Sequence, residues 1–213
     1  MLIAYIILAT LLLPITSSTK SERHALVDLY RSAHGEGWRR SDNWITSKNI
    51  CTWYGVTCSN TTSRIIQFSL YDNLLEGTIP DSLSALTELN YFALSTNKLR
   101  GPIPPSLHFA NCEYFDLRYN FLNSSFPPGL ANMTKITHLV LANNAFTDNG
   151  GLDSIVKDMR HLSYFDVRSN QLLGVAPASL CTKNLTFCGL VNPKYHTNAF
   201  STIPNCLQSK CII

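Results

Sequence analysis

The chain has 213 residues, with 17 Lys and Arg against 14 Asp and Glu and a formal net charge of +3 at pH 7. This length suits one elongated domain. The positive charge is mild, and the basic residues do not form a stripe that could follow a phosphate backbone, which argues against a nucleic-acid-binding protein.

The first recognisable segment is apolar. Residues 2–13 read LIAYIILATLLL without a charge, and small or hydroxylated residues follow at 16–18. The run is shorter than the roughly 20 apolar residues of a membrane-spanning helix, so we interpret residues 1–18 as a secretory signal. Because a basic residue does not precede it, a retained signal anchor stays an alternative. No later segment is apolar enough to span a bilayer, and we expect a secreted or cell-surface protein.

Cysteines and glycosylation sequons also fit export. The seven cysteines suit an oxidising compartment. The sequon Asn-x-Ser/Thr, which accepts N-linked glycans in exported proteins, begins at Asn60, Asn123, Asn132 and Asn184. We expect the first three to lie outside strands, on turns or convex positions, whereas Asn184 adjoins the last repeat described below.

Residues 19–63 begin with a helical pattern and are rich in tryptophan. The apolar residues with helical spacing are Ala25, Leu26, Leu29 and Tyr30. They predict an amphipathic helix with one apolar face. The tryptophans are Trp38, Trp44 and Trp53.

Residues 64–180 repeat one short pattern: an apolar residue, a gap, an apolar residue, two variable residues, Asn, a gap and an apolar residue. The five copies are FSLYDNLL (68–75), FALSTNKL (92–99), FDLRYNFL (115–122), LVLANNAF (139–146) and FDVRSNQL (165–172). The asparagines are Asn73, Asn97, Asn120, Asn144 and Asn170, with spacings by subtraction of 24, 23, 24 and 26 residues. This period and these residue types indicate leucine-rich repeats.

Each copy predicts a short strand and a turn. The alternating apolar residues would place one face of every strand in a core, so that neighbouring coils stack their strands into a parallel sheet. The recurrent Asn points inward, which is costly unless its amide pairs with backbone groups of its own and the next coil. We therefore expect an asparagine ladder.

The residues that follow each Asn indicate which subtype of leucine-rich repeat this is. Glycines at 77, 101 and 174 are followed by an apolar residue and Pro, as in EGTIPDSLSALTEL. This GxIP element and the upstream segment ERHALVDLYRSAHGEGWRRSDNWITSKNICTWYGVTC resemble plant-type leucine-rich-repeat proteins, including receptor-like protein ectodomains and polygalacturonase-inhibiting proteins. The resemblance implies an α/β solenoid: a right-handed superhelix with a parallel concave sheet, about five full repeats, a degenerate sixth and disulfide-bonded caps at both ends.

The resemblance also gives the ends a role. Residues 19–63 would be an N-terminal cap whose helix and tryptophans cover the first coil. The fourth copy has grown by two residues, which predicts a short helix around 152–159. Residues 181–213 would hold the degenerate sixth repeat, in which Pro193 stands where Asn is due, and a C-terminal cap.

Cysteine positions fit this plan. Cys51 and Cys58 flank Trp53 and should form the bridge of the N-terminal cap, while Cys112 takes an inward apolar position and should be unpaired. The last four, Cys181, Cys188, Cys206 and Cys211, would form two bridges in one of three pairings that the sequence leaves open. Export and the lack of a close CxxC pair favour disulfides over zinc.

Catalytic motifs are absent from the sequence. We find no GxSxG elbow, HExxH helix or phosphate-binding Gly loop. Asp116 and Asp166 could be taken for a glycosidase pair, but Arg118 and Arg168 stand two residues further on the same strands and should neutralise them. We therefore expect no enzyme, cofactor or metal site.

Recognition is the better interpretation of the concave face, because Tyr and Arg dominate the energetics of interfaces. The candidate partner-binding residues are Tyr91, Tyr114, Asp116, Arg118, Tyr119, His138, Tyr164, Asp166 and Arg168. We expect a binding module for an extracellular protein or glycan, with membrane association through a co-receptor as an option. Inhibition of a secreted cell-wall hydrolase and a role in adhesion or matrix are alternatives, since fold alone does not give function.

Overall fold

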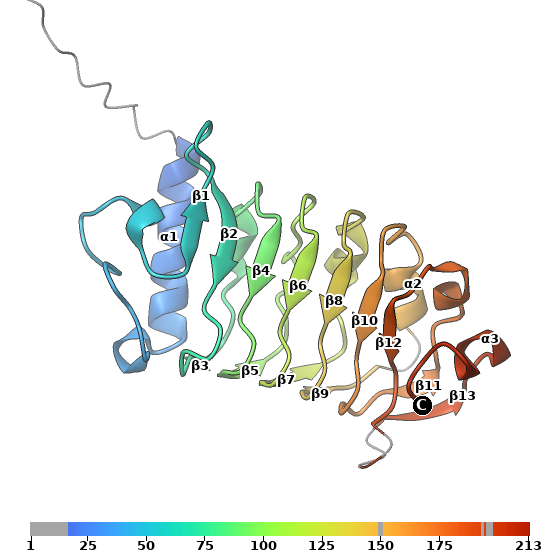
Figure 1. Ribbon diagram of the computed structural model, residues 1–213. Helices are drawn as coiled ribbons and strands as arrows, with labels where there is room; N and C mark the ends of the chain where they lie inside the picture. The colour runs from blue at the N-terminus through green and yellow to red at the C-terminus, as the bar shows by residue number, and fades with distance from the viewer. Residues whose placement is uncertain (1–16, 149–150, 193, 195–197) are drawn as a thin grey trace, which may run out of the picture.

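The computed structural model describes residues 17–148, 151–192, 194 and 198–213, and the predicted signal segment therefore lies almost wholly outside the described residues. The described chain winds into a solenoid whose coils follow one another in sequence order (Figure 1). Within these ranges, the helices are too short or too polar to cross a membrane.

A seven-stranded sheet forms one face of the solenoid. Its strands, in spatial order, are β1 (Val56–Cys58), β2 (Ile65–Ser69), β4 (Tyr91–Ala93), β6 (Tyr114–Asp116), β8 (His138–Val140), β10 (Tyr164–Asp166) and β12 (Phe187–Gly189). The hairpin β1–β2 is antiparallel and every later pair is parallel, with equivalent positions of successive coils in register. This confirms the parallel sheet expected from the repeats.

Smaller strands and short helices complete the coils. Beside the main sheet run β3 (Glu76–Gly77), β5 (Lys98–Gly101), β7 (Phe121–Ser124) and β9 (Ala145–Phe146), and further on β11 (Leu173–Val175) pairs with β13 (Ala199–Thr202). The remaining elements are α1 (Ser17–Ser32), η1 (Gly35–Gly37), η2 (Ile50–Thr52), η3 (Asp81–Ala85), η4 (Pro128–Asn132), α2 (Leu152–Val156), η5 (Ala178–Thr182) and α3 (Asn205–Gln208). The helix predicted at the insertion is present as α2, although it ends three residues earlier than expected.

Stacked apolar side chains fill the inside of the coils. Phe68, Phe92 and Phe115 are fully buried, with ring centroids 6.1 and 5.2 Å apart between successive coils. The apolar residues eight positions before each ladder Asn are also buried: Ile65, Leu89, Cys112, Ile136 and Leu162. Cys112 is the free cysteine, as predicted. Burial raises the pKa of its thiol to about 12, so the thiol behaves as a small apolar group.

The asparagine ladder is present and satisfies the backbone of adjacent coils. Asn120 is representative: its Nδ2 donates to the carbonyls of Leu94 (3.0 Å) and Leu117 (3.1 Å), and its Oδ1 accepts from the Leu99 N–H (3.0 Å). Each rung therefore joins its own coil to the preceding one, which accounts for a buried amide in an apolar interior.

The ladder extends one rung beyond the prediction. Pro193, where the sequence placed the missing sixth Asn, lies outside the described residues, and Asn198 occupies the rung instead. Its Oδ1 accepts from the Leu172 N–H (3.0 Å), and its Nδ2 donates to the carbonyls of Val167 (2.8 Å) and Leu190 (2.7 Å). The sixth coil therefore makes the same interior hydrogen bonds as the other coils, although a longer segment leads to its Asn.

Aromatic packing covers the first coil. Ala25, Leu26 and Leu29 of α1 are fully buried. Trp44 lies at the centre of the cap, with ring centroids 4.8 Å from Trp38, 4.9 Å from Trp53 and 6.3 Å from Phe68 in the first coil. The predicted disulfide between Cys51 and Cys58 is present.

The last coil is covered differently. Disulfides join Cys181 to Cys206 and Cys188 to Cys211, which decides among the three pairings. The segment after the second bridge adds to the edge of β12: the Ile212 N–H donates to the Cys188 carbonyl at 2.8 Å, and the Leu190 N–H donates to the Ile212 carbonyl at 3.0 Å. The edge strand of the main sheet is thereby paired.

Candidate functional site

Rings from five successive strands form one column on the concave face, and we call this set the aromatic column. Its members are Tyr91, Tyr114, His138, Tyr164 and Phe187. Successive ring centroids are 4.5, 5.4, 5.4 and 4.5 Å apart, and the first pair is parallel within 5°. In-register strands place the rings at this spacing, so each ring covers a face of its neighbour.

The column brings together four residues predicted from the sequence and one that was missed. Phe187 precedes Cys188 in the strand as Tyr114 precedes Phe115, and this register could have revealed it. Because Tyr114 is packed between Tyr91 and His138, its removal would open a gap in the column. Tyr114 therefore stabilises the face as well as exposing a polar edge.

Beside the aromatic column, the Asp116 carboxylate is buried and contacts Ser95, Arg118 and Tyr114. Its Oδ2 accepts from Ser95 Oγ at 3.0 Å and pairs with Arg118 Nε at 3.2 Å, and its Oδ1 accepts from the Arg118 N–H at 3.0 Å. The Tyr114 hydroxyl lies 3.4 Å from Oδ2. Burial raises the pKa of Asp116, and the hydrogen bond and charge of Arg118 oppose that rise. Burial and the negative charge of Asp116 together raise the pKa of Tyr114 to about 12, which keeps the phenol protonated.

Two coils further on, Asp166 and Arg168 repeat this arrangement with a closer pair. Arg168 Nη2 lies 2.8 Å from Asp166 Oδ2, and Arg168 Nε donates to Oδ1 at 2.9 Å. The hydrogen bond to Asp166 raises the pKa of Arg168. A Cβ at Gly189 would stand only 2.6 Å from Arg168 Nε, so the glycine leaves space for the guanidinium to reach over Phe187, at 4.9 Å from the ring centroid. The two predicted Asp–Arg pairs are confirmed.

These contacts give the predicted partner-binding residues different roles. Asp116 and Asp166 are only 2% and 3% exposed, so each carboxylate holds an arginine in place from below and offers a partner little surface. Arg118 and Arg168 are half-buried, so part of each guanidinium side chain stays accessible to a partner.

Tyr119 is the most exposed aromatic residue of the predicted set, at 55%. The residue before each of the five predicted ladder asparagines has a left-handed backbone, with φ values of 48° to 57°. At the other four coils this position holds a small or short polar residue: Asp72, Thr96, Asn143 and Ser169. A bulky residue is disfavoured there, and an exposed ring gains nothing from the core. Tyr119 is therefore an exception that local stability does not explain.

Comparison with known proteins agrees with this geometry. Residues 19–59 match the family model described as Leucine rich repeat N-terminal domain, and residues 111–133 match the model described as Leucine Rich Repeat. Receptor like protein 21 from Arabidopsis thaliana is 26% identical over 86% of this chain. The crystal structure of the BIR2 ectodomain from the same plant superposes with a TM-score of 0.69 at 26% identity, covering 86% of this chain and 94% of that one. The chain has the leucine-rich-repeat fold, and it resembles plant-type leucine-rich-repeat proteins.

Several relatives of this leucine-rich-repeat protein are receptors, and the chain spans only about a tenth to a fifth of the length of the curated relatives it matches first. Among solved structures, the ectodomain of the Arabidopsis receptor kinase HAESA, in complex with an IDA peptide hormone ligand, superposes with a TM-score of 0.67 at 26% identity. That match covers 87% of this chain and 30% of HAESA.

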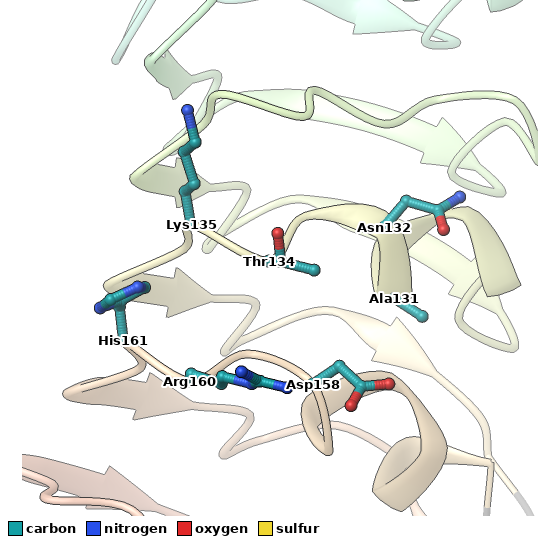
Figure 2. Close-up of a pocket in the computed structure, with 7 residues that line it drawn as sticks. All are labelled: Ala131, Asn132, Thr134, Lys135, Asp158, Arg160 and His161. Carbon is teal, nitrogen blue, oxygen red and sulfur yellow. The ribbon is translucent and has the colours of Figure 1, made fainter.

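Two shallow pockets of the leucine-rich-repeat protein lie away from the aromatic column. One, of about 560 Å³, is lined by Ala131, Asn132, Thr134, Lys135, Asp158, Arg160 and His161 (Figure 2). The other, of about 530 Å³, is lined by Asn49, Cys51, Val56, Thr57, Cys58, Ser59, Asn60 and Ser63. Each includes a sequon asparagine. The expectation that the first three sequons avoid strands is wrong for Asn123, which lies exposed in β7 because this segment pairs with β9.

Proposed function

We propose that this chain is an extracellular binding module that recognises a protein partner through its concave face. The likeness to receptor ectodomains supports binding rather than catalysis. The HAESA ectodomain binds a peptide hormone ligand in its crystal structure, which supports a ligand of peptide chemistry on this fold.

The observation that carries the proposal is the group formed by the exposed Tyr119 and the half-buried Arg118 and Arg168. Buried carboxylates fix both arginines, and Tyr119 stands in a backbone conformation that a bulky side chain disfavours. Fixed side chains lose little rotamer freedom on binding, which lowers the entropic cost of association. Arginine and tyrosine are also enriched among the residues that contribute most to protein interfaces.

The aromatic column favours a protein over a glycan. Sugars pack their C–H groups against open ring faces, but the ring faces inside the column are covered by neighbouring rings at 4.5 to 5.4 Å. The column therefore presents ring edges and polar atoms, which suit backbone amides and polar side chains of a protein.

The test is affinity for a partner captured from the extracellular fluid of the source organism and identified by mass spectrometry. We expect Arg118→Ala and Tyr119→Ala each to weaken binding by about 2 kcal/mol, or roughly thirtyfold, in isothermal titration calorimetry. Lys157→Ala is the matched control, because Lys157 is an exposed residue at the end of α2, away from the main sheet. Unchanged affinity in both concave variants would exclude this face as the binding surface.

A further inference from the structure

The pocket in Figure 2 lies between two neighbouring coils at the place where the repeat departs from its period. Asn132, Thr134 and Lys135 come from one coil, and Asp158, Arg160 and His161 from the next. The spacing of the ladder asparagines rises to 26 residues here, and α2 stands where coils before and after it have a short 3₁₀ helix. Asp158, Arg160 and His161 follow α2 in the chain, so one wall of the pocket comes directly after the lengthened segment.

Polar groups line this pocket, and only some of them are bonded to residues outside it. Lys135 Nζ donates to Asn111 Oδ1 at 2.7 Å. In the part of the chain that the structure describes, the Arg160 and His161 side chains have neither a hydrogen bond nor an ion pair. Asp158 adds an acceptor to this set of donors, and Ala131 adds a methyl group. Donors, an acceptor and a small apolar surface suit a polyhydroxylated ligand better than a simple anion, which Asp158 would repel.

A glycosylation sequon forms part of the pocket wall. Asn132 and Thr134 are the first and third residues of Asn-Met-Thr, and both are exposed, whereas Met133 between them is fully buried. The buried Met133 anchors the segment beside the pocket. The Asn132 side chain is exposed. Figure 2 shows its amide turned away from Arg160, so a sugar on Asn132 reaches the pocket through a change of the Asn132 rotamer.

We propose that an N-linked glycan on Asn132 packs into this pocket, with its first N-acetylglucosamine residues held by Arg160, Lys135, His161 and Asp158. In the attachment step, Asn132 Nδ2 loses a proton and bonds to the anomeric carbon of an oligosaccharide carried on a lipid pyrophosphate. The anomeric C–O bond breaks, and the lipid pyrophosphate leaves with the electron pair and takes up the proton. The inference rests on the extracellular location in the proposed function.

Two of the other sequons, at Asn60 and Asn123, lack this combination. Asn123 is exposed on β7 and does not line either pocket described above. Asn60 lines the second pocket, but its walls are neutral side chains and the Cys51–Cys58 bridge, which offer no charged donor. Among these sites, Asn132 alone has cationic groups beside its sugar.

The test is a thermal unfolding cycle on the full chain secreted by a eukaryotic host, after mass spectrometry of all four sequons. We expect Asn132 to carry a glycan, and Asn132→Gln to lower Tm by about 3 °C and to remove hydrogen-exchange protection at 131–135 and 157–162. Arg160→Ala should lower Tm by a similar amount in the glycosylated protein. In a protein that already carries Asn132→Gln, adding Arg160→Ala should not lower Tm further. The control, Asn123→Gln, should leave Tm and this protection unchanged.

The outcomes separate this inference from the function it rests on. A bare Asn132 beside a modified Asn123, or an equal effect of Arg160→Ala with and without the glycan, overturns the packed glycan and leaves the binding proposal standing. Four bare sequons in the secreted protein overturn the packed glycan as well, whereas retention of the concave partner still measures the binding function.

Discussion

The two ends of the solenoid are covered in contrasting ways. At the N-terminal cap, residues 19–63, a helix and the tryptophans Trp38, Trp44 and Trp53 pack together, and the single disulfide closes a loop with a sequence separation of 7. At the C-terminal cap, residues 199–213, Leu207 is the only fully buried apolar residue and two bridges span separations of 25 and 23. Apolar burial holds one end and covalent linkage holds the other.

The two ends of the solenoid need different amounts of buried apolar surface. Large aromatic side chains bury enough area to hold a cap by the hydrophobic effect. A short segment without them needs its unfolded state restricted, which a disulfide does more strongly as its loop lengthens. The two caps should therefore respond to different perturbations.

The largest effect is expected for Trp44→Ala. Its ring contacts Trp38, Trp53 and Phe68, so truncation should destabilise the protein by about 3 to 5 kcal/mol in urea unfolding. Tyr71→Ala is the control, because that ring is 56% exposed and its loss should change stability by less than about 0.5 kcal/mol. Equal losses for the two variants would mean that aromatic packing does not hold the N-terminal cap.

The bridges should rank by loop length. Replacing Cys181 and Cys206 by Ser should cost about 3.5 kcal/mol, against about 2.4 kcal/mol for Cys51 and Cys58, by the loop-closure estimate. Hydrogen exchange should localise the second loss to residues 21–60. The reverse ranking, or a uniform loss of protection along the chain, would refute the contrast between the caps.

The next largest effect is a difference in stability cost between substitutions at the two end rungs of the asparagine ladder. Asn198→Leu leaves the backbone groups of Leu172, Val167 and Leu190 without their partners, at about 1 to 3 kcal/mol for a buried group. Asn73→Leu should cost less, because its partner Arg40 is exposed and water can replace the amide. Chemical denaturation of both variants measures the difference, with Asn184→Gln as an exposed control.

The smallest effect is the contribution of one buried carboxylate of the N-terminal cap to the pH dependence of stability. Glu22 is fully buried and bonded to Arg64 at 2.8 Å, and burial raises its pKa above 4.5 despite that partner. A raised pKa in the folded state means that folding favours the protonated form. The contribution of Glu22 is therefore fully present below pH 4.5 and declines as pH rises through the folded pKa.

Glu22→Gln should make the decline of Tm with rising pH smaller, because Asp116, whose pKa is also raised, still contributes. Glu36→Gln, at an exposed position of the cap, should leave the decline unchanged. An unchanged pH profile in Glu22→Gln would show that another group is responsible.

Much of the fold follows from the sequence because burial imposes a period. The strands, the inward apolar residues and five ladder asparagines recur every 23 to 26 residues, and all are found where the pattern predicts them. Asn198 was missed because the last connection is longer and breaks the count. The motif Asn-Ala-Phe at 198–200 repeats that at 144–146 and would have identified it.

The site was less predictable, since it depends on which side chains cover which. Alternation placed Asp116 and Arg118 on the concave face, but only their contacts show the carboxylate beneath the guanidinium. Likewise, register put tyrosines in one column, whereas their mutual stacking required ring orientations. Surface roles depend on rotamers, which a repeat pattern does not specify.

All three tryptophans of the chain lie in the N-terminal cap. Intrinsic tryptophan fluorescence therefore reports on one end of the molecule, whereas far-ultraviolet circular dichroism averages over every coil. Coincident unfolding curves from the two signals would indicate a single cooperative unit. A fluorescence transition at a lower denaturant concentration than the circular-dichroism transition would show that the N-terminal cap opens before the other coils unfold.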